Sequence, residues 1–280
     1  MVVCADDSVD VTAEVFAGTV FEHVRVEAEG DLLWVVLNRP GRLNAMTDLM
    51  KREFLAIYEN VDRGPWRCVI IAGEGRAFCS GADLGQIGGV IDFADAERVR
   101  GYLDAGWQRV IELLRTVPVP TVAAVHGAAY GGGANLALAA DLIVAADTAT
   151  FCQSYIDRGI SPDLGGTVLL PRLVGVQHAR KQLLLGTPVP ADEALRIGMV
   201  CEVVPEATLR DRARALATAL AGKDPTALRV TRALIDGNVT RDLHTGLAHE
   251  SRGVGETLSS PIFKASTDRY TGPAGHVPRS

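Results

Sequence analysis

Three glycine-rich clusters constrain this chain most, because each is too irregular to form a continuous helix or strand. They lie at residues 72–83, 126–135 and 159–166. The first two each follow an apolar run typical of a buried strand, at residues 68–71 and 121–125. In an open α/β sheet, the turn between a strand and the next helix exposes backbone N–H groups to a ligand. The pattern therefore favours an α/β fold with its binding site at these turns.

Glycine clusters also have a plainer interpretation, since glycine permits tight turns and close packing without binding anything. The known nucleotide-binding patterns do not fit. Gly73-x-Gly75-x-x-Phe78 lacks the third glycine of the dinucleotide fingerprint, and no G-K-[ST] sequence follows Gly131. The sequence also contains no G-x-S-x-G nucleophile elbow. Structural turns and a ligand site of another class both stay open at this point.

Composition limits the partners and the compartment. The 280 residues carry 28 Lys and Arg against 34 Asp and Glu, a formal net charge of −6. Duplex nucleic acid is bound by neutralising its phosphates, so an acidic chain without a basic run predicts no nucleic-acid partner. The 5 cysteines form no CxxC pair, the acidic start does not resemble a signal peptide, and no apolar run reaches the ~20 residues of a bilayer span. We expect a cytoplasmic protein without a membrane partner or a metal site.

Periodicity along the chain predicts an α/β core followed by helices. The opening residues 23–37 are typical of a β-hairpin, Thr47 is placed to cap a helix, and residues 99–114 show the period of one long helix. From Val168 onward the pattern is mostly helical. We predict a flexible N-terminal segment at residues 1–18, a core domain at 19–205, a C-terminal helical region at 206–270 and a tail at 271–280.

Six blocks of sequence, in a fixed order, carry a family resemblance. They are Leu37 to Pro40 with Arg42 to Ala45, Ala77 to Leu84, Pro120 to Gly133, Ala140 to Leu142, Gly165 to Thr167, and Pro171 to Gly175. Together they resemble the crotonase superfamily of enoyl-CoA hydratases and isomerases, over about residues 24–204. The resemblance implies a crotonase (ClpP-like) fold, an α/β spiral of ββα units with a C-terminal helical trimerisation region. It also implies an acyl-CoA thioester substrate, no cofactor beyond the coenzyme A of that substrate, and a homo-trimer or hexamer.

The resemblance further implies an oxyanion hole made of two backbone N–H groups. Carried over to this sequence, they belong to Ala82, which follows the glycine of the first motif, and to Gly132, the centre of the glycine triple. A thioester carbonyl gathers negative charge as it becomes an enolate, and preorganised donors stabilise that charge. Glycine at position 132 lets the backbone approach the oxygen.

For the coenzyme A part of the substrate, the resemblance implies one basic residue and a short stretch of the first motif. Arg42 matches the residue that meets the nucleotide end, and Ala82, Asp83 and Leu84 match the stretch near the adenine. The plainer interpretation of Arg42 is an arginine that faces solvent and binds nothing.

The sequence departs from the hydratase pattern at both carboxylate positions. Asn135 stands where hydratases carry their first Glu, and Tyr155 stands where they carry their second. Water addition needs groups that deprotonate water and protonate the α-carbon, and neither side chain is a good base at neutral pH. We expect both side chains to line the substrate pocket instead.

Asp163 is the acidic residue that the sequence offers in their place. Isomerases of the family carry an acidic residue at this position, and one carboxylate suffices to move a proton along a conjugated system. The neighbouring Ile160, Leu164 and Leu169 predict partial desolvation, which raises a carboxyl pKa and makes the group a better base. The alternative is that Asp163 only caps a helix that begins at Leu164.

The favoured activity is therefore double-bond isomerisation of an enoyl-CoA, with Ala82, Gly132 and Asp163 as the catalytic set. An enoyl-CoA hydratase (a lyase) of fatty-acid or related acyl-CoA degradation is the first alternative. Attack by Asp163 on the acyl group, and a non-catalytic acyl-CoA-binding protein, are the others. The length, branching and ring content of the acyl chain cannot be predicted from the sequence, because residues 86–93 and 94–117 form its pocket through tertiary packing.

Overall fold

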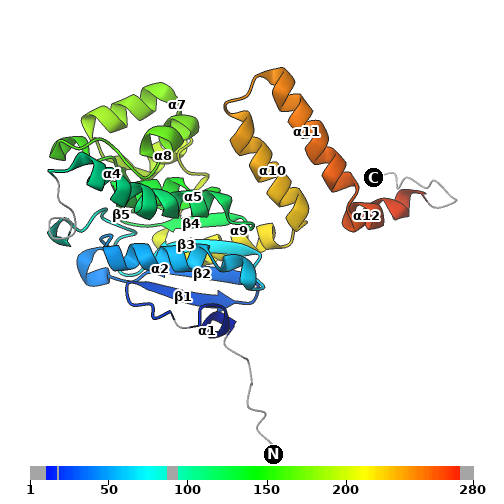
Figure 1. Ribbon diagram of the computed structural model, residues 1–280, viewed down its shortest axis with the longest axis horizontal. Helices are drawn as coiled ribbons and strands as arrows, with labels where there is room; N and C mark the ends of the chain where they lie inside the picture. Colours follow the sequence, from blue (N-terminus) through cyan, green and yellow to red (C-terminus); the bar gives the residue numbers. More distant parts are fainter. Residues whose placement is uncertain (1–10, 18, 87–93, 272–280) are drawn as a thin grey trace, which may run out of the picture. The chain divides into compact units, whose positions relative to one another are not determined.

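The computed structural model describes residues 11–17, 19–86 and 94–271 (Figure 1). The chain forms two compact units that divide after Leu220, and the predicted boundary at residue 205 stays a prediction. Of the predicted terminal segments, residues 1–10 and 272–280 lie outside the described part, while a short helix, α1 (Val11–Val15), precedes the core.

A six-stranded sheet forms the centre of the first unit. In spatial order it contains β1 (Val24–Glu29), β2 (Leu32–Leu37), β3 (Cys68–Gly73), β4 (Thr121–Val125), β6 (Leu142–Ala146) and β9 (Glu202–Val204). The pair β1 and β2 is the predicted antiparallel hairpin, and the remaining neighbours are parallel. Every residue of β2 and β4 is buried, which explains why both read as almost unbroken apolar runs.

A second, three-stranded sheet contains β5 (Ala128–Tyr130), β7 (Thr150–Cys152) and β8 (Val189–Pro190). The chain passes from β4 to β5 through Gly127, which has φ +51° and whose Cβ, if it had one, would lie 2.3 Å from the Arg76 carbonyl oxygen. Only glycine fits there. A helix follows each strand pair, α6 (Gly132–Leu138) after β4 and β5, and α7 (Gly166–Leu185) after β6 and β7. This order confirms the predicted ββα architecture.

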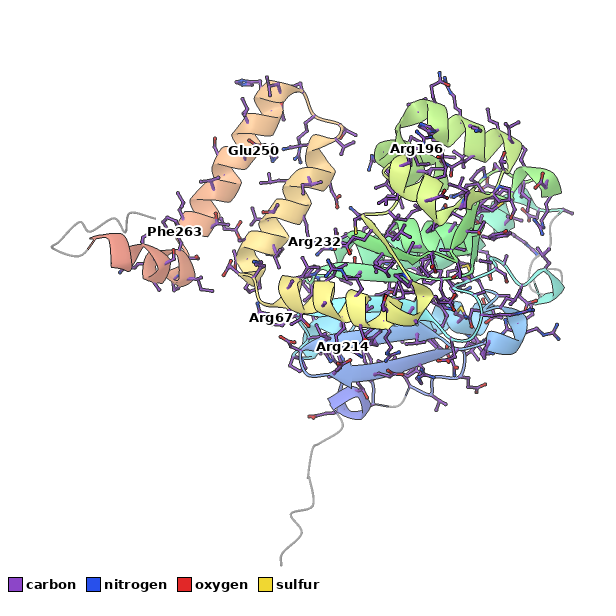
Figure 2. All side chains as sticks on the ribbon, turned by 180° about the vertical axis from the view of Figure 1, so that it is seen from behind. Arg67, Arg196, Arg214, Arg232, Glu250 and Phe263 are labelled. Atoms are coloured by element: carbon purple, nitrogen blue, oxygen red, sulfur yellow. The ribbon has the colours of Figure 1, made fainter. Side chains whose placement is uncertain are left out.

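Two faces of the large sheet are covered by different helices. Core residues of β2 such as Leu33 and Val35 pack with Phe54 of α2 (Asp48–Tyr58), and Thr47 caps α2 as predicted, its Oγ1 accepting the Met50 N–H at 3.1 Å. On the other face lies α9 (Leu209–Ala221), in front in Figure 2, where its Arg214 is labelled. Arg210 of α9 stacks 4.2 Å from the ring centroid of Trp34. The first unit also contains α8 (Ala191–Arg196).

The predicted single helix at 99–114 is wrong in one respect. Two helices, α4 (Ala96–Leu103) and α5 (Arg109–Thr116), are joined by a π-helical segment at Asp104–Gln108. Gly106 inside this segment has φ −115° and ψ −107°, a backbone conformation that is not helical. Apolar spacing alone did not reveal the break, because Trp107 and Val110 keep to the buried side through it.

In the described part of the second unit the chain forms the helices α10 (Pro225–Asn238), α11 (Leu243–Leu258) and α12 (Pro261–Thr271). Gly253 of α11 lies close against α10, since a Cβ there would be 2.8 Å from Val230 Cγ1. Figure 2 labels Glu250 on α11 and Phe263 on α12. All three helices lie in or at the end of the helical region predicted at residues 206–270. Within the described residues, no helix has the length and apolar content that crossing a membrane requires.

Candidate active site

A cavity of about 210 Å³ lies in the first unit. Its walls come from five stretches of the chain, at residues 46–48, 80–86, 99–107, 131–132 and 154–164. All three glycine-rich clusters contribute, which is where the sequence predicted a binding site. Gln86 and residues of the 94–117 region border it as expected for the acyl pocket, and residues 87–93 lie outside the described part.

Backbone hydrogen bonds hold the first two glycine motifs side by side. The Cys79 N–H donates to the Ala128 carbonyl, and the Tyr130 N–H donates back to the Cys79 carbonyl, each at 2.9 Å. Gly81 has φ +89°, and a Cβ on it would lie 2.7 Å from the Tyr130 carbonyl oxygen. Position 81 therefore requires glycine for two reasons, its left-handed φ and the closeness of the second motif.

This contact brings the predicted N–H pair to one place. Ala82 and Gly132 both border the cavity, and the Cβ position of Gly81 is only 3.7 Å from the Gly132 nitrogen. Across the described part of the chain, neither the Ala82 nor the Gly132 N–H donates to a protein acceptor. Gly132 opens α6, whose first-turn N–H groups have no partner inside the helix. Both donors are thus available to an oxygen atom in the cavity.

Four side chains form a continuous chain of hydrogen bonds beside the cavity. The Tyr155 hydroxyl donates to Asp163 Oδ1 at 2.6 Å. Asn135 Nδ2 donates to the Tyr155 oxygen at 3.0 Å and to the Asp163 carbonyl at 2.9 Å. Gln153 Nε2 donates to Asn135 Oδ1 at 2.8 Å. Tyr155 and Asp163 border the cavity.

Asn135 does not lie where the sequence placed it. Its side chain is fully buried, does not belong to the described cavity wall, and has its amide group in hydrogen bonds with Gln153, Tyr155 and Asp163. A Cβ on Gly166 would lie 2.6 Å from Asn135 Nδ2, so the glycine at the start of α7 makes room for this amide. Asn135 therefore positions Tyr155 and Asp163 rather than meeting a ligand.

Asp163 carries the electrostatic character expected of a base. Burial raises its carboxyl pKa above the ordinary value, and the hydrogen bond from Tyr155 offsets part of that rise. Burial and the nearby Asp163 carboxylate also raise the pKa of the Tyr155 phenol. Tyr155 consequently keeps its proton at neutral pH and acts as a hydrogen-bond donor to Asp163.

The alternative that Asp163 caps a helix from Leu164 is wrong. Leu164 has φ +47°, and α7 begins at Gly166, with Gly165 at its N-cap and no side-chain cap. The Asp163 carboxylate points to Tyr155 instead, and only its backbone carbonyl meets the helix, accepting the Gly166 N–H at 2.9 Å.

The residues matched to coenzyme A contacts lie in two places. Ala82, Asp83 and Leu84 border the cavity, with Leu84 55% exposed and Asp83 in an ion pair with Arg39 at 3.0 Å. Arg42 is exposed on the short helix at Pro40–Arg42 and does not border the cavity. Within the described residues its guanidinium forms no ion pair or hydrogen bond, which leaves it accessible to a ligand.

Comparison with known proteins identifies the family. The model of the enoyl-CoA hydratase/isomerase family matches residues 27–272. The chain belongs to this family. The 1,2-epoxyphenylacetyl-CoA isomerase of Escherichia coli is 34% identical over 81% of this chain and 86% of its own length. The short-chain-enoyl-CoA hydratase of Clostridium acetobutylicum is 35% identical over 85% of this chain and 90% of its own length.

Solved structures agree on the fold. The crystal structure of an enoyl-CoA hydratase from Bacillus anthracis superposes with a TM-score of 0.82 and 30% identity, covering 89% of this chain and 96% of that chain. This confirms the crotonase fold predicted from the six sequence blocks. The chain is an acyl-CoA-processing enzyme of the enoyl-CoA hydratase/isomerase family, and its relatives include both hydratases and isomerases.

The family motifs did not draw attention to part of the cavity wall. Asp48, Tyr102 and Trp107 border the cavity, although none belongs to a block that resembles the family. Asp48 is the first residue of α2, and the other two belong to α4 and to the π-helical segment. Tyr102 and Trp107 fall in the region at 94–117 that was expected to form the acyl pocket, whereas the position of Asp48 beside them depends on how two distant helices pack and leaves no local signal in the sequence.

Proposed function

We propose that this family member isomerises the double bond of an enoyl-CoA thioester, with Asp163 carrying the proton. The supporting observation is that Asp163 shares one cavity with the N–H groups of Ala82 and Gly132. A thioester oxygen at those two donors brings the acyl carbons next to it into the cavity that the Asp163 carboxylate borders.

The reaction then needs only these groups. The Asp163 carboxylate removes a proton from the carbon between the thioester and a 3,4-double bond, and the electron pair moves onto the thioester oxygen as a dienolate. The N–H groups of Ala82 and Gly132 stabilise that negative charge, and losing one such donor typically costs about 3 kcal/mol of transition-state stabilisation. The protonated Asp163 returns the proton to the fourth carbon, which leaves a 2-enoyl thioester and a carboxylate.

Electrostatics favour Asp163 over the other acidic residues of the cavity. Asp48, Asp83 and Asp163 are the carboxylates that border it in the described part of the chain. Asp48 pairs with Lys51, which lowers the pKa of Asp48, and Asp83 pairs with Arg39, so each of these two carboxylates has a cationic partner. Asp163 has no cationic partner among the described residues, and burial raises its pKa. A carboxylate of this kind is the better proton acceptor.

Tyr155 and Asn135 support isomerisation rather than hydration. Tyr155 occupies Asp163 Oδ1 and leaves Oδ2 for the substrate proton. Asn135 has both Nδ2 hydrogens in hydrogen bonds with protein groups, and its fully buried side chain does not border the cavity, so it is not placed to activate water there. With one basic carboxylate at the cavity, a proton shift is chemically simpler than the addition of water.

An acyl-CoA panel tests this proposal. Purified protein is given 3-enoyl-CoA and 2-enoyl-CoA thioesters, and double-bond movement and hydration are both followed. We expect conversion of 3-enoyl-CoA to 2-enoyl-CoA with little hydration of crotonyl-CoA. Hydration as the faster reaction would favour the second candidate, an enoyl-CoA hydratase, which the relatives of that name support. Tight binding without turnover would indicate a carrier, and a covalent acyl-enzyme in a mass spectrum would indicate attack by Asp163.

For the coenzyme A end, we propose contacts with Ala82, Asp83 and Leu84 at the cavity and with the accessible guanidinium of Arg42. Assembly as a homo-trimer or hexamer in the cytoplasm also remains a proposal. Exposed apolar side chains on α10 and α11, such as Ile235, Leu247 and Val254, support the oligomer. A stable monomer in a sizing measurement would contradict it.

A further inference from the structure

A second polar cluster borders the cavity, and the proposed proton shift does not use it. It consists of Asp48, Lys51 and Tyr102. The Lys51 ammonium pairs with the Asp48 carboxylate, the Tyr102 hydroxyl donates to Asp48 Oδ1 at 3.3 Å, and Lys51 Nζ lies 4.0 Å from the centroid of the Tyr102 ring. Asp48 and Tyr102 border the cavity, whereas the Lys51 side chain is only 11% exposed.

The helix packing around Lys51 holds this cluster in place. Asp48 and Lys51 lie one turn apart on α2, and Tyr102 is on α4. The π-helical segment after α4 lies against the lysine stem, since a Cβ on Gly106 would be 2.7 Å from Lys51 Cδ. Widened turns of this kind occur frequently at functional sites. A buried lysine fixed from two sides keeps the Asp48 carboxylate and the Tyr102 hydroxyl at the cavity wall.

The charges of the cluster determine what it can bind. The hydrogen bond from Lys51 lowers the pKa of Asp48, and burial raises the pKa of Tyr102, so the pair presents an ionised carboxylate and a protonated phenol. Arg52 also contacts Asp48, but its side chain is 67% exposed. Because Lys51 is turned to the carboxylate and the ring, the groups offered to the cavity are hydrogen-bond acceptors.

The residues around the cluster further restrict the class of ligand that fits it. Val99, Leu103 and Trp107 border the same cavity and suit a hydrocarbon chain. Asp48 follows Met46 by two residues, and Met46 pairs with Ala82, so the cluster lies on the wall that also carries one of the thioester donors. A neutral hydrogen-bond donor on an acyl chain fits this site, whereas a second carboxylate would be repelled by Asp48.

We propose that Asp48 and Tyr102 form a subsite for a hydroxyl group on the acyl chain of the CoA thioester. This inference rests on the proposed function, because it places the acyl group in this cavity. The hydroxyl donates to the Asp48 carboxylate or to the Tyr102 oxygen, and Lys51 balances the charge. The enzyme therefore prefers hydroxylated acyl-CoA substrates to plain ones of equal length.

Binding of unreactive ligands tests the subsite without any turnover. Calorimetry compares a saturated medium-chain acyl-CoA with a series of the same length that carries one hydroxyl at successive carbons beyond the third. We expect at least one hydroxylated ligand to bind about tenfold more tightly, the gain of one hydrogen bond to a charged group. An acyl-CoA of the same length with a terminal carboxylate is measured as well. Equal affinities across the hydroxylated series, or tighter binding of the carboxylate ligand than of every hydroxylated one, would overturn the proposal.

Two variants assign the preference to the cluster. Tyr102→Phe keeps the ring over Lys51 and removes the hydroxyl, and Asp48→Asn keeps the shape and removes the charge. Each should reduce the ratio of the two affinities severalfold, and Tyr102→Phe decides alone if Asp48→Asn does not fold. Arg98→Ala is the matched control on α4, where Arg98 pairs with Asp95 and is 74% exposed, and it should keep the ratio. A ratio unchanged in Tyr102→Phe and in folded Asp48→Asn would contradict the subsite.

The same measurement on Asp163→Asn separates the two proposals. If the preference for the hydroxylated ligand persists while this variant and the wild type both fail to isomerise, the proposed reaction is wrong and the subsite stands. If the wild type isomerises but shows no preference, the subsite is wrong and the reaction stands.

Discussion

Two aspartates of one cavity receive a hydrogen bond from a tyrosine, and their acidities shift in opposite directions. Asp163 accepts from Tyr155 and has a raised pKa, whereas Asp48 accepts from Tyr102 and has a lowered one. The causes differ, because burial raises the pKa of Asp163, which has no cationic partner among the described residues, whereas the hydrogen bond from Lys51 lowers the pKa of the less buried Asp48. A tyrosine hydroxyl alone does not offset burial. The comparison teaches that burial without a cation suits Asp163 to the proposed role of base, whereas the Lys51 cation suits Asp48 to the proposed role of fixed acceptor.

The proposed reaction requires the backbone donors of Ala82 and Gly132 to stabilise the negative charge that proton removal by Asp163 creates. Gly81→Ala puts a Cβ 2.7 Å from the Tyr130 carbonyl oxygen at φ +89°, and so forces the two glycine motifs apart. We expect kcat for isomerisation to fall by roughly 100-fold, the usual loss for one oxyanion donor. Gly41→Ala is the control, because its Cβ would meet no atom within 4 Å. Equal activity in both variants would show that the motif contact does not matter.

Tyr155→Phe tests the difference between the two aspartates through the pH dependence of kcat. The Tyr155 hydrogen bond lowers the pKa of Asp163, so its removal raises that pKa further. Because the base must be ionised, the acid limb of the kcat profile should move to higher pH, and kcat at neutral pH should fall by about tenfold. Tyr102→Phe should leave the acid limb where it is. An identical shift in both variants would mean that the limb does not report Asp163.

Lys51→Met removes the cation from Asp48 at nearly constant volume. We expect unfolding in urea to show a loss of about 1–2 kcal/mol at neutral pH, from the ion pair and the contact with the Tyr102 ring. The folded-state pKa of Asp48 lies below its ordinary value, so this stabilisation is present above the unfolded pKa and is lost as the pH falls through the folded one. The difference in stability between the two proteins should therefore shrink in acid to the part that comes from the contact with the Tyr102 ring, and a constant difference at all pH values would contradict this explanation.

Arg42→Ala should have the smallest effect. Arg42 is exposed and lies outside the cavity wall, so a contact with the phosphates of coenzyme A contributes little more than a screened surface ion pair. We expect KM to rise severalfold with kcat nearly unchanged. Arg63→Ala, also exposed and on the short helix at Val61–Arg63, serves as the control for a general change in charge. An unchanged KM for Arg42→Ala would refute the proposed contact.

The fold was largely predictable because its signals are local. Buried strands such as β2 correspond to short apolar runs in the sequence, and Thr47 caps α2 as its sequence position indicated. The glycine motifs were also predictable, since the left-handed φ of Gly81 and Gly127 restricts both positions to one residue type. Where the chain departs from a regular element without such a signal, as at Gly106 in the π-helical segment, periodicity missed the break.

The candidate site was predictable in part. Motifs led to Ala82, Gly132 and Asp163, which the fold brings to one cavity. The burial of Asn135 was not predictable, because it depends on the packing of Gly166 against the amide. The cluster of Asp48, Lys51 and Tyr102 was not predictable either. It is formed by two helices separated along the chain, and a charged residue in a helix is most often a solvated one.

The most direct test of the account is the rate of 3-enoyl-CoA isomerisation by Asp163→Asn beside Asp48→Asn. Both substitutions remove one negative charge from the same cavity at constant size. If Asp163 carries the proton, its variant should lose roughly 10²–10⁴-fold in kcat, while Asp48→Asn should keep kcat within about tenfold, since a fixed hydrogen-bond acceptor affects binding more than proton transfer. An Asp163→Asn enzyme that isomerises at the wild-type rate would contradict the central claim.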